Sequence, residues 1–374
     1  MRFAVVGAGP IGLEMALAAR EAGHEVTVYE ADDVGAHVGQ WGHVQLFTPW
    51  SMNTTARGRE AVGTAGLDDP ETCPTGAELV DRYLRPLAAG LDVRRHHRVT
   101  SMTRPWKGKG AQLGSKARMD SPFQLLIDTP QGEHTAVADI VVDCTGVFGD
   151  PAPLGTGGGP VPGERGNSAV RYGPLAVDDL AGKRVLLVGD GASAATVLTD
   201  LLDLEPLPSI HWITPSAQVP GFVSPPDDPL PLRRELVATC EGALEVVHHH
   251  PHAAIARLEG STATLDTGET VEVDAVLACT GFRPDHRLSR ELQVHLCWGS
   301  EGPMKLAAAL LSAKGDGPAD CLAGGAEGPE LLQSPEPGFF LLGNKSYGRR
   351  SDFLLGVGHR QVEDVLSLVS AYGV

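Results

Sequence analysis

Apolar runs, glycine-rich turns and helix-forming stretches follow one another at the start of this chain. Arg2–Val6 is an apolar run, and a turn with glycines at positions 7, 9 and 12 comes directly after it. Leu13–Ala22 is rich in residues that favour helices, and Gly23 can end a helix. Glu25–Tyr29 is a second apolar run, which ends at Glu30. The pattern predicts a strand, a tight turn, a helix and a second strand.

The same pattern returns in the second half of the chain. Lys183–Val188 is an apolar run, Gly189–Ala194 a turn, Ala195–Asp203 a helix-forming stretch and Ile210–Thr214 another apolar run. In both halves a later strand-like run ends in the tripeptide Cys-Thr-Gly, at residues 144–146 and 279–281. An internal repeat of this kind indicates two domains of similar architecture. We therefore expect an α/β fold with two Rossmann-like domains, in which residues 1–172 and 283–374 form a discontinuous first domain and residues 173–282 an inserted second one.

The stretches outside the repeat give weaker patterns. Residues 31–75 are rich in Gly, Pro and Trp and predict irregular structure, whereas Thr75 and Glu78 have the spacing of a capping box that starts a helix ending near Ala89. Two strand-like stretches, Arg98–Thr103 and Phe123–Asp128, enclose the polar segment 105–121, for which we expect a mobile hairpin loop. A helix is expected near 304–312, a strand at 338–343 and a last helix at 361–371.

The charge and composition of the chain limit the classes of partner that it is expected to bind. The 374 residues carry a formal net charge of −17 and contain no cluster of Lys or Arg. Nucleic acids and anionic membranes select for basic surfaces, so neither is expected as a partner. No apolar run approaches the ~20 residues that span a bilayer, and the first strand starts directly after Met1 without a signal peptide. We expect a cytoplasmic protein that acts on a small molecule, and the sequence leaves a homodimer open.

The cysteines and histidines do not predict a metal site. Six cysteines stand at positions 73, 144, 240, 279, 297 and 321, and no two of them form a Cys-x-x-Cys pair. This scatter argues against a disulfide framework and against zinc. His248, His249, His250 and His252 form a cluster, but adjacent strand residues point to opposite faces and no neighbouring Cys or carboxylate completes a ligand set. We expect no metal.

The first glycine turn has the complete dinucleotide fingerprint, G-x-G-x-x-G. Gly7 permits the tight turn, Gly9 lets the backbone approach a pyrophosphate, and Gly12 lets the helix pack closely on the strand. The pyrophosphate would lie at the helix N-terminus, where free N–H groups and the helix dipole favour anions. An acid at the end of the next strand can accept hydrogen bonds from ribose hydroxyls. The residues expected to bind this nucleotide are Gly7, Gly9, Pro10, Ile11, Gly12 and Glu30.

The second glycine turn reads G-x-G-x-x-A, which the fingerprint tolerates. The strand after it ends at residues 211–216 in His-Trp-Ile-Thr-Pro-Ser, with neither the acid of NAD sites nor an arginine for a 2′-phosphate. Arg233 and Arg234, in the next polar stretch, could supply that charge. We therefore favour NADPH over NADH, and a degenerate domain without nucleotide is the alternative. The residues expected to bind here are Gly189, Gly191, Ala192, Ser193 and Ala194.

Together these features resemble the flavoprotein superfamily with two dinucleotide-binding domains, which includes thioredoxin reductases, glutathione-reductase-like enzymes and flavin-containing monooxygenases. The resemblance covers nearly the whole chain and implies FAD in the first domain and NAD(P)H in the second. Where the superfamily has Gly-Asp after its last strand, this chain has Gly343-Asn344, whose amide can still bind a ribityl hydroxyl. The N-terminus of the last helix, near residues 358–362, is placed at the flavin. The resemblance adds as cofactor-binding residues Thr145, Gly146, Thr280, Gly281, Gly343, Asn344 and Gln361.

The disulfide reductases of this superfamily need two redox cysteines close together, and this chain has no such pair. Its Gly39-Gln40-Trp41 stretch, with Trp50 nearby, resembles the G-G-x-W stretch of flavin monooxygenases. We therefore expect Gln40 and Trp41 to bind the flavin, with Trp41 acting in catalysis by excluding water. The alternative is that Trp41 and Trp50 are ordinary packing aromatics. The Baeyer–Villiger fingerprint is absent, which favours oxygenation of a nitrogen or sulfur atom.

Segment 345–353 follows the last strand, where the resemblance places the flavin edge. We expect Tyr347 and Arg349 to act there on an anionic substrate or on the flavin, and a solvated loop with one packing tyrosine is the alternative. The expected activity is monooxygenation of a small molecule at N or S, through a C4a-(hydro)peroxyflavin. Two alternatives stay open. One is NAD(P)H-dependent reduction of a small disulfide or quinone, with Cys321 as a lone redox thiol or with no cysteine, and the other is a non-catalytic nucleotide-binding protein.

Overall fold

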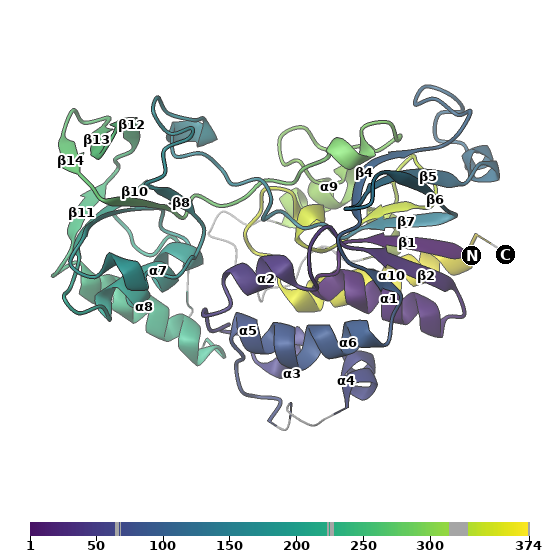
Figure 1. Ribbon diagram of the computed structural model, residues 1–374, viewed down its shortest axis with the longest axis horizontal. Coiled ribbons are helices and arrows are strands. Elements are labelled where there is room, and N and C mark those ends of the chain that lie inside the picture. The colour runs from purple at the N-terminus through teal and green to yellow at the C-terminus, as the bar shows by residue number, and fades with distance from the viewer. Residues whose placement is uncertain (64–66, 68, 223, 225–227, 314–327, 373–374) are drawn as a thin grey trace. The chain divides into compact units, whose positions relative to one another are not determined.

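The computed structural model describes residues 1–63, 67, 69–222, 224, 228–313 and 328–372. The chain forms two compact α/β units (Figure 1). Unit 1 contains residues 1–150 and the described residues from 283 onward, and unit 2 contains residues 151–282. Among the described residues, no helix is both long and apolar enough to cross a membrane.

Unit 1 is built on a five-stranded parallel sheet, ordered β16-β7-β1-β2-β3. Because all its strands run in one direction, their carboxyl ends meet at one edge, which is where ligands bind in open α/β sheets. The strand bounds are β1 (Arg2–Val6), β2 (Glu25–Tyr29), β3 (Val93–Arg94), β7 (Ile140–Asp143) and β16 (Phe339–Leu341).

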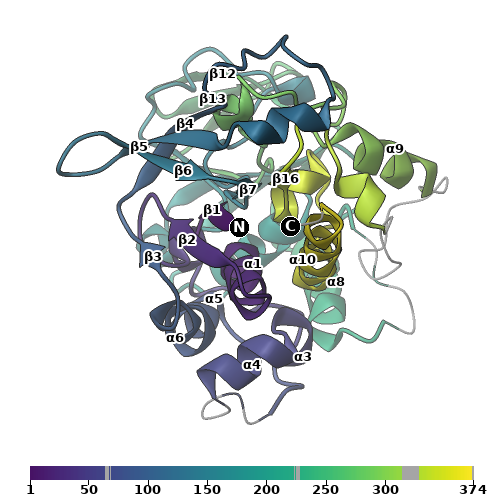
Figure 2. The same cartoon turned by 90° about the vertical axis from the view of Figure 1, so that its right-hand side faces the viewer.

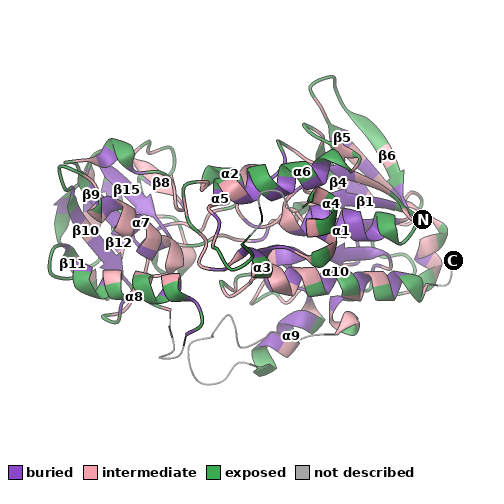
Figure 3. Ribbon diagram, turned by 90° about the horizontal axis from the view of Figure 1, so that it is seen from below, coloured by how far each residue is buried: buried purple, intermediate pink, exposed green. Residues whose placement is uncertain are grey.

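Different layers cover the two faces of this sheet (Figure 2). Helices α1 (Pro10–Glu21) and α10 (Leu355–Ser370) pack on the face that carries Phe3 and Val5. The antiparallel strands β4 (Arg98–Thr103), β5 (Phe123–Asp128) and β6 (His134–Ala138) cover the face that carries Ala4 and Val6. Figure 3 shows α1 buried along most of its length, whereas α10 has a buried and an exposed face.

The last helix begins at Leu355, six residues before the expected position 361. Its first turns contain Gly356 and Gly358. Because glycine lowers helix propensity, the sequence pattern did not predict that these turns are helical. Close packing explains the glycine, because a Cβ atom at Gly358 would lie 2.4 Å from the Ile11 side chain.

Residues 31–75 contain three short helices where irregular structure was expected. These are α2 (Ala36–Gln40), α3 (Trp50–Asn53) and α4 (Ala56–Val62), and each is too short to show a hydrophobic period. The expected capping box is present, since the side chains of Thr75 and Glu78 each accept a hydrogen bond from the other's backbone N–H. It starts a continuous helical segment made of α5 (Gly76–Leu79), the π-turn η1 (Val80–Leu84) and α6 (Arg85–Ala89).

Segment 105–121, for which a mobile loop was expected, is held to unit 1 by buried contacts. Arg118 is fully buried and donates to both carboxylate oxygens of Glu336, and Arg104 donates to the same carboxylate at 2.6 Å. Both ion pairs are fully buried. A charge in a polar stretch is normally read as solvated, so the sequence pattern gave no sign that Arg118 would be buried.

Unit 2 repeats the parallel arrangement, with strand order β11-β10-β9-β15-β8. Helices α7 (Ala192–Leu202) and α8 (Pro231–Ala243) pack on one face of this sheet, and a small antiparallel sheet of β12 (Ile255–Glu259), β13 (Thr262–Leu265) and β14 (Thr270–Glu272) covers the other. The main-sheet strands are β8 (Val170–Tyr172), β9 (Arg184–Val188), β10 (Ser209–Thr214), β11 (His248–Pro251) and β15 (Ala275–Ala278).

The boundary between the units lies at Asp150, before the expected position 172. The reason is β8, which pairs in parallel with β15 and so belongs to the sheet of unit 2. The remaining helical elements are α9 (Met304–Ala313) and the 3₁₀ turns η2 (Lys116–Asp120), η3 (Thr156–Gly158), η4 (Asp178–Leu180), η5 (Arg287–Ser289), η6 (Pro329–Leu332) and η7 (Gly343–Tyr347).

Candidate functional site

The first glycine turn connects β1 to α1 at the carboxyl edge of the unit 1 sheet. Gly7 has φ +104°, and a Cβ atom there would lie 2.7 Å from the carbonyl oxygen of Cys144, so only glycine fits. Gly9 precedes α1, and no atom lies within 4 Å of where its Cβ would be. The first N–H groups of a helix have no acceptor within it. The turn therefore presents open backbone donors to an anion such as a pyrophosphate.

Glu30 lies directly beside this turn. Its carboxylate accepts hydrogen bonds from the backbone N–H of Ala8 at 2.6 Å and of Asp32 at 2.8 Å. These two bonds fix the carboxylate next to the glycine turn. This is the position in which an acid can accept hydrogen bonds from the ribose of a bound nucleotide.

A buried ion pair occupies the carboxyl ends of β7 and β16. Lys345 Nζ lies 2.6 Å from Asp143 Oδ2 and 2.9 Å from Thr145 Oγ1, and both charged side chains are 1% exposed. The Thr145 hydroxyl and backbone N–H donate to the other oxygen of Asp143. The predicted cofactor residue Thr145 is thus hydrogen-bonded to an ion pair that no local sequence pattern predicts. The one signal was a carboxylate at the end of the otherwise apolar β7.

Gln361, expected at the flavin, supports the neighbouring turn. Its Oε1 accepts from the Gly343 backbone N–H at 3.0 Å, and its Nε2 donates to Ser346 Oγ at 2.8 Å. Both ends of the amide are therefore used within the protein. Asn344, in the turn that Gln361 holds, differs, because its Oδ1 is buried and has no hydrogen-bond partner among the described residues.

The environments of the two tryptophans differ. Trp41 packs against Gly76 and lies with its ring 6.2 Å from that of Phe148, while its Nε1 is buried without a hydrogen-bond partner in the described part of the chain. Trp50 is 2% exposed and belongs to the core, with Arg82 over its ring, so it is a packing residue. Gln40, at the end of α2, is exposed.

Tyr347 and Arg349 lie in different surroundings, although the sequence predicted a common role. Tyr347 is 3% exposed and packs edge-on against Phe353 at 5.4 Å. Arg349 is exposed and forms an ion pair with Glu301 at 2.6 Å. The two predicted catalytic side chains are thus a core tyrosine and an arginine that lines a cavity.

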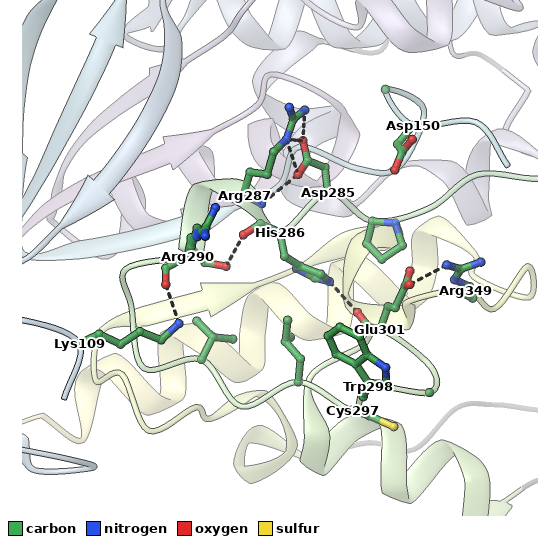
Figure 4. Close-up of a pocket in the computed structure, with 16 residues that line it drawn as sticks. Lys109, Asp150, Asp285, His286, Arg287, Arg290, Cys297, Trp298, Glu301 and Arg349 are labelled. Carbon is green, nitrogen blue, oxygen red and sulfur yellow. Dashed lines mark hydrogen bonds and ion pairs between the residues drawn. The ribbon is translucent and has the colours of Figure 1, made fainter. Parts of the chain in front are cut away.

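This cavity, called here the His286 cavity, lies in unit 1 and has a volume of about 1130 Å³ (Figure 4). His286 Nε2 lies 2.7 Å from the Glu301 carbonyl oxygen. Burial lowers the pKa of the His286 imidazole below its usual range. His286 stands in a loop-rich stretch without a motif, so no sequence pattern points to it. The lining side chains with polar or reactive groups are Lys109, Asp150, Asp285, His286, Arg287, Ser289, Arg290, Cys297, Trp298, Glu301 and Arg349.

The second glycine turn has the same geometry at the carboxyl edge of the unit 2 sheet. Gly189 has φ +121°, and a Cβ there would lie 2.4 Å from the Cys279 carbonyl oxygen. Gly191 precedes α7 with open space around it, and Ala194 is fully buried where the helix meets the sheet. Ala192 and Ser193 form the first turn of α7, and Thr280 and Gly281 follow β15 at the same edge. Burial raises the pKa of Asp190, which stands inside this turn.

Arg233 does not provide the free charge expected for a 2′-phosphate. It is 3% exposed, and its Nε lies 2.5 Å from Asp228 Oδ2, because α8 turns this side chain inward. Arg234, the next residue on α8, is exposed.

The histidines of β11 point to alternate faces of the sheet. His249 lies beside Trp212 on one face, whereas His248 and His250 stack with His211 on the other. Among the described residues, no group of three His, Cys, Asp or Glu side chains is placed to hold a metal ion.

Comparisons with known proteins show which solved structures share this architecture. Solved structures with the same fold include the bacillithiol disulfide reductase Bdr (YpdA) from Bacillus cereus, with TM-score 0.73 and 16% identity over 99% of this chain and 100% of that one. A flavin-containing monooxygenase from Stenotrophomonas maltophilia has TM-score 0.62 and 19% identity over 100% and 99%. An ornithine N-hydroxylase from Kutzneria sp. 744 has TM-score 0.66 and 16% identity over 100% and 99%.

The comparison with curated protein sequences gives no match. The family model described as pyridine nucleotide-disulphide oxidoreductase matches residues 4–298, which is most of the chain. With two Rossmann-like units and a dinucleotide turn in each, the chain belongs to the pyridine nucleotide-disulphide oxidoreductase family, within the superfamily of flavoproteins with two dinucleotide-binding domains.

Proposed function

We propose that this protein is an NAD(P)H-dependent flavin monooxygenase that oxygenates a nitrogen or sulfur atom of a small molecule. In this proposal unit 1 binds FAD and unit 2 binds NAD(P)H, with NADPH favoured. Bound FAD would accept hydride from the nicotinamide and react with oxygen. The protein's own residues bind and orient the cofactors and exclude water.

The residues of unit 1 fit FAD. The open turn at Gly9 suits the pyrophosphate, and Glu30 suits the ribose. Asn344 Oδ1 and Trp41 Nε1 are buried polar atoms without a partner among the described residues. Such atoms are rare in folded proteins, and a bound ligand that supplies the missing hydrogen bond is one explanation. Asn344 would accept from a ribityl hydroxyl and Trp41 would wall the flavin.

The residues of unit 2 fit a second dinucleotide. The turn around Gly191 is open, as at Gly9, and α7 directs its N-terminus to it. No acid stands at the end of β10, which disfavours the NAD type of ribose contact. With Arg233 held by Asp228, the exposed Arg234 is the remaining one of the two arginines for a 2′-phosphate.

The positions of the cysteines are the main observation that favours monooxygenation over disulfide reduction. The sequence contains no Cys-x-x-Cys pair, and Cys73, Cys144, Cys240, Cys279 and Cys297 are all free thiols. Burial raises the pKa of the first four thiols, which makes them poor nucleophiles. Cys321, the candidate lone redox thiol, lies outside the described residues.

Reduction of a small disulfide is the second candidate, because one thiol differs from the rest. Cys297 lines the His286 cavity, and hydrogen bonds from Ser300 and Gly299 lower its pKa. A thiolate of this kind could attack a disulfide. The fold of a bacillithiol disulfide reductase is compatible with this activity.

Oxygen stoichiometry separates these candidates. We would first record the visible spectrum of the purified protein without oxygen, before and after NADPH and then NADH. A flavin spectrum that bleaches supports both cofactors, and subsequent substrate-coupled uptake of oxygen supports monooxygenation. Turnover without oxygen supports a reductase, and a spectrum that neither nucleotide bleaches contradicts both and favours the non-catalytic alternative.

A further inference from the structure

His286, which lines this cavity, has an unused hydrogen-bond acceptor. Its Nε2 faces a carbonyl oxygen of Glu301 at 2.7 Å. A carbonyl only accepts, so Nε2 carries the proton, and in the neutral ring Nδ1 is then the acceptor. Nδ1 is buried and has no hydrogen-bond partner among the described residues. A ligand donor would satisfy it.

The ring is held in its neutral form. Burial, the largest effect, lowers the His286 pKa. The hydrogen bond to the Glu301 carbonyl opposes it, and the Lys345 charge lowers the pKa further. Nδ1 is therefore available as a base at neutral pH. An imidazole of this kind has a pKa below about 6.5, whereas a thiol has about 8.5 and an alkylammonium about 10.4. The thiol is the easier of the two to deprotonate.

Two cations in the same cavity have no acidic partner in the described part of the chain. Lys109 Nζ donates to the backbone carbonyl of Arg290, and neither side chain forms an ion pair with a described residue. The other two arginines of the cavity are paired, Arg287 with Asp285 and Arg349 with Glu301, each at 2.6 Å. In Figure 4, Lys109 and Arg290 lie on one side of His286, and Trp298 and Arg349 lie on the other. The unpaired cations suit an anionic group of a ligand.

We propose that the His286 cavity binds a small anionic thiol, with its S–H directed at Nδ1 of His286 and its anionic group at Lys109 and Arg290. The S–H bond breaks, the proton passes to Nδ1, and the electron pair stays on sulfur. The thiolate is the soft nucleophile that oxygenation at sulfur requires. Trp298, 97% exposed at the cavity, offers a ring to cover the ligand stem. This inference rests on the proposed function, since it names the substrate class.

The test uses the FAD-loaded full chain with ¹⁵N-labelled histidine and no NAD(P)H. N-acetyl-L-cysteine is the probe, and the His286 signals are identified by their loss in His286→Gln. We expect a saturable change at His286 Nδ1. The S-methyl derivative, which lacks the S–H, should bind about two- to tenfold more weakly, the range of one hydrogen bond. The amide of the probe, which lacks the carboxylate, should bind about two- to fivefold more weakly.

The variants separate binding from folding. His286→Gln keeps a donor for the Glu301 carbonyl but loses the base, so it should keep its melting temperature and FAD content and lose the preference for the free thiol. Lys109→Gln should lose the preference for the carboxylate. The control is Lys305→Gln, which removes an exposed lysine that is bound to Gln333 outside this cavity. It should keep the preference for the carboxylate. Cys297→Ser should behave like the unmodified protein, since no bond to Cys297 is proposed.

Unchanged His286 signals at high probe concentration, or equal binding of the three compounds, would overturn the proposal. Loss of the effect in Cys297→Ser would assign it to thiol chemistry at Cys297 and overturn it as well. Because no nicotinamide or turnover is involved, this failure is distinct from failure of the proposed function, which is read from flavin reduction and oxygen uptake.

Discussion

Lys345 and Asp143 form a buried ion pair in unit 1 that contacts the predicted cofactor residue Thr145. Both side chains are 1% exposed, so neither charge is stabilised by water. A buried ion pair adds little net stability, but removing one partner leaves an isolated charge in a medium of low dielectric constant. The pair therefore links strand β7 to the turn after β16 at the edge of the sheet.

We expect Lys345→Met to lower the free energy of unfolding by about 3–5 kcal/mol, because Asp143 would remain as an unpaired buried charge. Urea unfolding followed by circular dichroism measures this. The double variant Asp143→Asn with Lys345→Met removes both charges and keeps an acceptor for Thr145, so it should recover part of the loss. A double variant no more stable than Lys345→Met would contradict the explanation.

Segment 105–121 shows how one carboxylate can order an element. Glu336 accepts from Arg104, from Arg118 and from the backbone N–H of Gln293 at 2.9 Å, so three parts of unit 1 meet at one side chain. Lys109 of the His286 cavity belongs to this anchored segment. The shape of the cavity thus depends on a buried contact outside it.

Glu336→Gln should destabilise the protein by about 3–5 kcal/mol, since two arginines lose their buried counter-charge. Trypsin should then cleave faster at Lys107 and Lys109. The control is Glu330→Gln, which changes an exposed glutamate on η6 and should leave the cleavage rate as it is. Equal cleavage in both variants would show that Glu336 does not hold the segment.

We expect His359 on helix α10 to make the free energy of unfolding depend on pH. Burial lowers the pKa of His359 to about 4, from about 6.5 in an unfolded chain. Below pH 6.5 the unfolded chain takes up this proton and the folded chain does not, so stability falls between about pH 6.5 and 4 as pH decreases. A partly exposed group should contribute about 1–3 kcal/mol. His359→Gln should flatten this part of the pH profile, measured by urea unfolding at several pH values, and an unchanged slope would rule His359 out as the cause.

Over the whole molecule, the same turn geometry occurs once in each unit. At Gly7 and Gly189 a positive φ coincides with a close approach to the strand that ends in Cys-Thr-Gly, and each turn leaves its second glycine open. Because we propose that the two turns bind different nucleotides, a substitution in one turn should leave nucleotide binding at the other unchanged.

Gly191→Glu should raise the NADPH concentration needed to reduce the flavin and leave the flavin spectrum intact. The new carboxylate would face the nucleotide pyrophosphate, and like charges near a protein surface repel by about 1–4 kcal/mol, so NADPH should bind about five- to a thousandfold more weakly. Gly242→Glu on α8 adds the same charge in open space and serves as the control. Stopped-flow reduction without oxygen measures both, and normal reduction of Gly191→Glu would exclude this turn as the site.

The sequence by itself determined the repeated strand, turn and helix units, both glycine turns and Glu30, because local periodicity and backbone conformation depend on residues close together in the chain. It placed Trp41 and Asn344 in candidate positions, but it missed the helical start at Leu355 and the membership of β8 in the second sheet. Only the tertiary structure decided that Arg118, Lys345 and Arg233 are buried in ion pairs and that His286 lines a cavity. Arg118 and Lys345 are buried against partners far along the chain, 218 residues away for Glu336 and 202 for Asp143, and local patterns carry no information about such partners. Asp228 is only five residues from Arg233, and there it is the packing of α8 that buries the pair.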